Sequence, residues 1–176
     1  MKRGELEHVI RAACQIADDD ELVIIGSQSI LGAVPNAPAS LLVSNEADVY
    51  PKNHPERADL VDGTIGEGSP FHDTFGYYAQ GVGEDTAILP RGWKDRLVPV
   101  RNANTRDCTG WCLEPHDLVV AKYVAGREKD LRFGREALAH GIVTAETLLA
   151  RLRATDVDEA RRSLAHARIE RDAKGG

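Results

Sequence analysis

The pattern of hydrophobic and polar positions predicts helices at both ends of the chain and strands in its middle. Leu6, Val9, Ile10 and Ala13 recur at helical spacing, which predicts an amphipathic helix over residues 4–18. Short apolar runs bounded by turn residues predict strands at 22–25, 41–50, 75–82, 86–89 and 96–101. Further helices are expected at 115–125, 127–139, 144–153 and 156–170. This order of elements is typical of an α/β or α+β fold with a helical C-terminal tail.

Turn and cap residues refine these boundaries. Gly126 suits the position after one helix, and Thr144 and Asp156 suit the N-caps of the last two. Short helix starts are expected at 27–31 and 55–61. The glycine-rich residues 63–70 predict a loop long enough to be a mobile flap.

Length and composition indicate a globular chain with a real hydrophobic core. Its 176 residues are 42% hydrophobic and 28% charged, and no run approaches the roughly 20 apolar residues of a membrane span. The first residues lack the apolar segment of a signal peptide, so we expect a cytoplasmic protein that does not associate with a membrane. Cys108, Cys112 and His116 are spaced four apart, which suits either a metal site or small buried thiols in a reducing compartment. We expect the thiols.

Two short motifs carry candidate chemistry. A β-branched run ends at Gly26-Ser27, where backbone N–H groups near a helix start suit an anionic phosphate. Glu46 and Asp48 follow about twenty residues later, two apart in a predicted strand, so both carboxylates should point to one face. Two like charges this close are costly unless a cation lies between them. Mg²⁺ takes such hard oxygen ligands, with substrate phosphates completing its shell.

Charge is unevenly distributed along the chain. The net charge is −6, with seven acids against two basic residues over residues 44–73. Residues 91–106 show the opposite bias, with five basic side chains against Asp95: Arg91, Lys94, Arg96, Arg101 and Arg106. A basic stretch beside an acidic metal-binding stretch would suit an enzyme that acts on nucleic acid, and a solvated surface loop would show the same bias.

Three motifs in this order resemble the nucleotidyltransferase-fold superfamily. They are Gly26-Ser27, Glu46-Ala47-Asp48, and the block that runs from Asp117 through Lys122 to Arg127-Glu128-Lys129-Asp130. The resemblance covers about residues 20–135 and is closest to a compact bacterial branch near the AbiEii-type toxins. It implies a mixed sheet flanked by helices, with a nucleotidyltransferase-like domain at 1–135 and a helical extension at 136–176.

The resemblance also assigns roles to the motif residues. Glu46 and Asp48 would hold Mg²⁺ or Mn²⁺, and Gly26, Ser27, Lys122 and Arg127 would bind the nucleotide. Lys122 and Asp130 would join the two carboxylates in the catalytic set. Two departures stand out: the usual pair is Asp-x-Asp, whereas this chain has Glu46 first, and the expected strands offer no third carboxylate.

The leading expectation is therefore an enzyme that transfers a nucleoside monophosphate from an NTP to an acceptor hydroxyl. The resemblance implies tRNA or another RNA as acceptor and a cognate antitoxin as partner. Two alternatives stay open. One is a non-catalytic nucleotide- or protein-binding member of a toxin–antitoxin pair, which the missing third acid favours. The other is a nucleotidyltransferase that modifies a small molecule such as an antibiotic.

Overall fold

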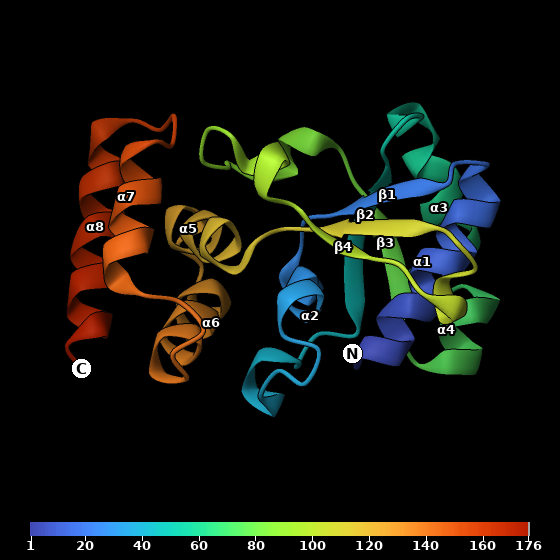
Figure 1. Ribbon diagram of the computed structural model, residues 1–176, viewed down its shortest axis with the longest axis horizontal. Coiled ribbons are helices and arrows are strands. Elements are labelled where there is room, and N and C mark those ends of the chain that lie inside the picture. Colours follow the sequence, from blue (N-terminus) through green and yellow to red (C-terminus); the bar gives the residue numbers. More distant parts are fainter. Residues whose placement is uncertain (176) are drawn as a thin grey trace. The chain divides into compact units, whose positions relative to one another are not determined.

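The computed structural model describes residues 1–175, and the chain divides into two compact units that are described separately. Unit 1 consists of Met1–Thr86 and Leu97–Leu113, and unit 2 of Ala87–Arg96 and Glu114–Gly176. Unit 1 contains the sheet, and unit 2 contains the last four helices (Figure 1). None of the helices in the described residues is long and apolar enough to cross a membrane.

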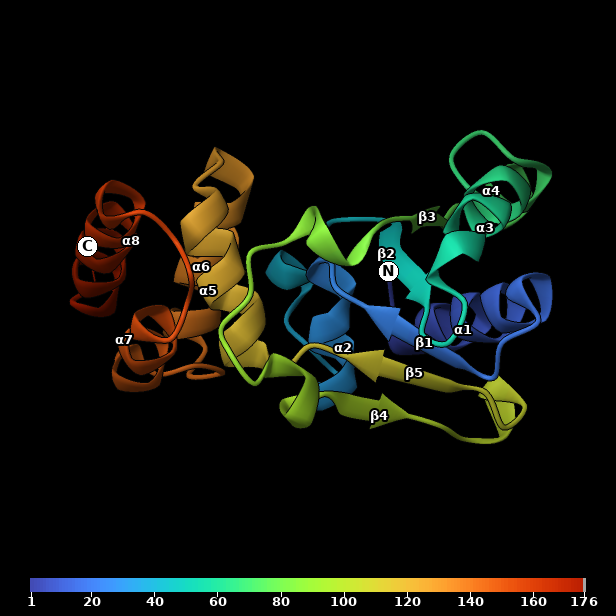
Figure 2. The same cartoon turned by 90° about the horizontal axis from the view of Figure 1, so that it is seen from above.

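The sheet of unit 1 has five strands in the order β3-β2-β1-β5-β4. Their bounds are β1 Glu21–Ile24, β2 Glu46–Pro51, β3 Tyr78–Gly81, β4 Val98–Val100 and β5 Thr109–Cys112. The central strand β1 pairs antiparallel with β2 and parallel with β5, while β2 and β3 are parallel. Figure 2 shows β1, β5 and β4 side by side. The expected mixed sheet within an α+β fold is confirmed.

Four α-helices belong to unit 1: α1 Arg3–Ala17, α2 Ile30–Ala33, α3 Ala58–Ile65 and α4 Pro70–Phe75. The apolar stripe of α1 is fully buried, as its spacing predicts. Ile10 of this stripe lies against Gly110 of β5, where a Cβ would clash with the Ile10 side chain. A side chain at residue 110 would therefore displace Ile10, and glycine lets the helix pack closely on the sheet here.

Unit 2 contains α5 Pro115–Ala125, α6 Glu128–Ala139, α7 Ala145–Arg153 and α8 Glu159–Ala173. Gly126 ends α5 in the left-handed conformation (φ 70°), and the Thr144 hydroxyl accepts from the backbone N–H of Thr147 to cap α7. These predictions are confirmed. The N-cap of α8 is Asp158, so the choice of Asp156 was wrong. Residue 135, the expected domain boundary, lies inside α6.

Short 3₁₀ segments occur at Ser27–Ser29, Ala39–Leu41, Pro55–Arg57, Glu84–Thr86, Trp93–Arg96 and Ala103–Thr105. They account for part of the mismatch with the predicted strands. Residues 86–89 form no strand, and β2 begins only at Glu46 rather than at residue 41. The predicted flap at 63–70 is also wrong, because Gly63 and Ile65 belong to α3 and only a short connection precedes α4.

A disulfide joins Cys14 of α1 to Cys108, 94 residues apart in the sequence. The expectation that Cys108 and Cys112 are both buried thiols is therefore corrected for Cys108, and among the cysteines, all of which the structure describes, only Cys112 is free. Because Cys108 is already bonded to Cys14, it does not form a metal site with Cys112 and His116. The bond links the first helix of unit 1 to the segment that leads into β5.

Candidate functional site

The two candidate metal ligands lie on one face of β2. Glu46 and Asp48 are partly exposed. Ala47, which lies between them, and Val49, which follows Asp48, are fully buried. This alternation places both carboxylates on the same side of the sheet. Because β2 runs antiparallel to β1, its Glu46 end lies beside the end of β1 that leads into Gly26.

Gly26 and Asp48 approach each other closely. A Cβ added to Gly26 would overlap the Asp48 carboxylate, and the backbone N–H of Ile25 donates to the Asp48 carbonyl at 3.1 Å. The φ of Gly26 is −84°, a value open to any residue, so space rather than backbone conformation requires glycine here. The Gly-Ser motif and the acid-x-acid motif are thus brought together within unit 1.

Ser27 opens the short 3₁₀ segment after Gly26 and is partly exposed. The next side chains are buried: the Gln28 amide donates to the Ser44 carbonyl at 3.0 Å, and Ser29 is fully buried. This packing fixes the first turn against the segment that precedes β2. Ser27 is therefore the hydroxyl of this turn that solvent can reach.

The neighbouring strand β3 adds two residues that the sequence did not point to. In the parallel pairing of β2 with β3, Glu46 lies opposite Tyr78 and Asp48 opposite Gln80. Paired residues project to the same face, so these four side chains share one side of the sheet. The Tyr78 hydroxyl donates to Glu46 Oε2 at 3.2 Å. Burial, and then the negative charge of Glu46, raise the pKa of Tyr78 to about 12, so the hydroxyl keeps its proton at neutral pH.

These residues fit a divalent metal ion that also binds the substrate. Residues 1–175 contain no group of three or more His, Cys, Asp or Glu side chains that could hold a metal ion. The protein would therefore supply the two carboxylates of Glu46 and Asp48. That donor set suits Mg²⁺, which is commonly held by one or two carboxylates together with substrate phosphates and water.

In unit 2, the predicted cationic residues form a cluster around one buried carboxylate. Asp130 is 1% exposed, and it pairs with Lys122 at 3.0 Å and with Arg127 at 2.5 Å. Burial acts to raise the pKa of Asp130, but the hydrogen bond from Arg127 and the charge of Lys122 outweigh it, so the pKa is lowered. The Lys122 ammonium also lies over the Phe133 ring, 5.6 Å from its centroid. Lys129, by contrast, is exposed.

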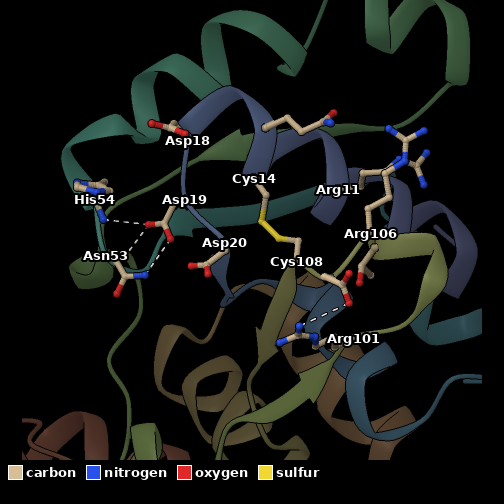
Figure 3. A pocket seen from close by; sticks show the side chains of 13 residues that line it. Arg11, Cys14, Asp18, Asp19, Asp20, Asn53, His54, Arg101, Arg106 and Cys108 are labelled. Carbon is tan, nitrogen blue, oxygen red and sulfur yellow. Dashed lines mark hydrogen bonds and ion pairs between the residues drawn. A yellow bond between two sulfur atoms is a disulfide. The ribbon is translucent and has the colours of Figure 1, made fainter.

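The basic stretch 91–106 is divided between the two units. Arg96 belongs to unit 2, where it makes two hydrogen bonds to the fully buried Asp117 at 2.8 and 2.9 Å. Arg101 and Arg106 belong to unit 1 and line a cavity of about 560 Å³ with Arg11 and the disulfide (Figure 3). Asp18, Asp19 and Asp20 also line this cavity, next to the start of β1 and at the opposite end of that strand from Gly26.

Comparisons with known proteins support the superfamily that the motifs resemble. Searches of curated proteins and of solved structures found no match. One family matches over nearly the whole chain, and its description names nucleotidyltransferases without an AbiEii-type branch, so that branch stays a prediction. The chain belongs to this family, described as nucleotidyltransferase of unknown function (DUF6036), whose model matches residues 4–171.

Proposed function

We propose that the protein transfers a nucleoside monophosphate from an NTP to an acceptor hydroxyl in a Mg²⁺- or Mn²⁺-dependent reaction that releases pyrophosphate. The observation that carries this proposal is the placement of the Asp48 carboxylate against Gly26, with Glu46 on the same face of β2. The divalent ion supplies charge neutralisation on the phosphates and lowers the pKa of the attacking hydroxyl.

Different residues of the chain bind the phosphates, hold the metal ion and neutralise charge. Ser27 and the backbone at Gly26 bind phosphate oxygens, and Glu46 and Asp48 hold the metal ion. For Lys122 of unit 2, the resemblance implies a role in offsetting the charge that develops on the pyrophosphate leaving group, with Arg127 as a second cation. Asp130 restrains Lys122 through their 3.0 Å ion pair. A lysine suits the phosphate role because its ammonium is a compact charge on a flexible stem.

The choice of acceptor rests on the resemblance to toxin nucleotidyltransferases. It favours tRNA or another RNA, with a cognate antitoxin protein as partner and growth inhibition as the outcome. The basic stretch 91–106 lends less support than its sequence suggested, because Arg96 is bound to the buried Asp117.

One observation favours a second candidate function, that of a non-catalytic nucleotide-binding member of a toxin–antitoxin pair. The described residues supply no third acidic, His or Cys side chain to the two carboxylates. Such a member would bind NTP and metal without transferring label to any acceptor.

Incubation with each labelled NTP, Mg²⁺ and total tRNA tests the proposal, with an aminoglycoside as a small-molecule acceptor in parallel. We expect label in the RNA. Asp48→Asn should abolish transfer, because it removes a ligand charge with little change in shape. Asp18→Asn is the matched control, since the Asp18 side chain is 98% exposed and lies at the other end of β1. Nucleotide binding without transfer to either acceptor would favour the non-catalytic member, and unchanged transfer by Asp48→Asn would overturn the proposed site.

A further inference from the structure

We infer that Tyr78 is a positioning residue that holds the Glu46 carboxylate in the orientation needed to bind the metal ion, an inference that rests on the proposed function. It starts from strand register. Glu46 and Tyr78 are paired across the parallel strands β2 and β3, and their side chains meet on the face that also carries Asp48. Neither side chain is fully buried, so packing alone does not fix the position of the carboxylate.

The hydrogen bond explains how Glu46 can serve as a metal ligand at a position where an aspartate side chain would be shorter and less flexible. Glutamate has one more rotatable side-chain bond than aspartate, so more conformational freedom is lost when its carboxylate is held in one place. The Tyr78 hydroxyl donates to Oε2 of Glu46 and leaves Oε1 for the metal ion. Hydrogen-bond partners of this kind orient metal-binding carboxylates, and their loss typically lowers metal affinity about 10–100-fold.

Tyr78 is itself held in place from outside the sheet. The His72 ring of α4 packs against the Tyr78 ring with centroids 4.6 Å apart. His72 is fixed in turn, because its Nδ1 accepts from the backbone N–H of Gly68 at 3.0 Å. A continuous set of contacts therefore runs from the connection before α4, through His72 and Tyr78, to Glu46. The hydroxyl that reaches the carboxylate is attached to a ring with restricted movement.

The neighbouring Tyr77 offers a matched control. It carries the same hydroxyl, but that hydroxyl is hydrogen-bonded to Nδ1 of His8 at 2.8 Å, within an aromatic group that also contains Phe71 and Phe75. Tyr77→Phe and Tyr78→Phe therefore remove the same atom from adjacent residues. Only the second change removes a hydrogen bond to Glu46.

Titration with Mn²⁺ in the absence of nucleotide, followed by electron paramagnetic resonance, tests the inference on the full chain. Tyr78→Phe should weaken Mn²⁺ binding about 10–100-fold, while Tyr77→Phe should bind as the wild type does. In a Glu46→Gln background, Tyr78→Phe should have no further effect, because the group that Tyr78 positions is already lost. A purely structural role would weaken binding equally in both backgrounds and would overturn the inference.

Asp48→Asn in the same titration distinguishes failure of the Tyr78 inference from failure of the proposed function. If Asp48→Asn loses Mn²⁺ binding and Tyr78→Phe keeps it, the positioning role of Tyr78 is wrong and the proposed function stands. If Asp48→Asn binds Mn²⁺ as the wild type does, the metal site itself is wrong and the inference is overturned with it. The same conclusion follows if the wild type retains no more Mn²⁺ than Asp48→Asn does when a non-hydrolysable NTP is also present.

Discussion

Gly26 and Asp48 are so close that no side chain fits between them. Gly26 follows the end of β1 and precedes the 3₁₀ segment Ser27–Ser29, and Asp48 lies on the neighbouring strand β2. The contact therefore joins the Gly-Ser and acid-x-acid motifs in space. The glycine is required by the approach of a carboxylate rather than by its φ of −84°. A substitution at Gly26 therefore tests the site directly.

Gly26→Ala should weaken both Mn²⁺ binding and nucleotide transfer, because the new methyl group forces the Asp48 carboxylate to move. Overpacking of this kind costs about 1–3 kcal/mol of unfolding free energy. Gly63→Ala is the matched control: it lies in α3 with nothing near a Cβ, and alanine is favoured in helices by up to about 1 kcal/mol. Titration with Mn²⁺ and thermal unfolding of both variants would check this. Normal Mn²⁺ affinity in Gly26→Ala would show that Asp48 is not a ligand.

The elements that could be predicted from the sequence are those with a local signal. Helices α1, α5, α6 and α7 combine helical spacing with caps such as Thr144 and Gly126. Helix α4 also has a local signal, Ser69 as N-cap and Pro70 at the first position, but the surrounding glycines favoured a loop. Gly63 did not break α3, since an isolated glycine costs a helix only about 1 kcal/mol.

Long-range pairing explains what the sequence could not show. The spacing of Glu46 and Asp48 placed them on one face because the period of a strand is local. The contact of Tyr78 with Glu46 depends on β3 pairing in parallel with β2, which no local pattern specifies. The same holds for Cys14 and Cys108, which are 94 residues apart.

Gln80 lies opposite Asp48 on β3, where a third carboxylate would share the face of the sheet with Glu46 and Asp48. Gln80→Glu should tighten Mn²⁺ binding by adding an anionic oxygen ligand. Without metal the variant should be slightly less stable, since like charges directly opposite each other on a sheet are destabilising. Gln15→Glu adds the same charge at an exposed site on α1 and should change neither the Mn²⁺ affinity nor the stability without metal. Equal Mn²⁺ affinities of the two variants would contradict the placement of Gln80.

The disulfide yields a prediction about stability. Closing a loop of 94 residues should stabilise the fold by about 2–4 kcal/mol, and reduction should lower the melting temperature accordingly. Thiol titration in denaturant gives an independent reading: one reactive thiol, Cys112, before reduction and three after it. Cys14→Ser combined with Cys108→Ser should show the lower melting temperature with or without reductant. Three thiols in untreated protein would mean that the bond does not form.

Lys122 and Lys129 should differ sharply in their contribution to nucleotide binding. Lys122 has a side chain only 13% exposed and is held by the buried Asp130, whereas Lys129 is exposed on the first turn of α6. A charge-assisted hydrogen bond contributes about 1.5–3 kcal/mol, so Lys122→Ala should weaken binding of a non-hydrolysable NTP with Mg²⁺ about 10–100-fold.

Lys129→Ala is the matched control, because it removes the same charge from a residue on the following helix. Isothermal titration of both variants measures the difference. Thermal unfolding run alongside shows whether Lys122→Ala stays folded, since Arg127 continues to pair with Asp130 after the lysine is removed. Equal affinities of two folded variants would mean that Lys122 serves only as the partner of Asp130. The phosphate role suggested by the Lys122 to Asp130 block would then be absent from this chain.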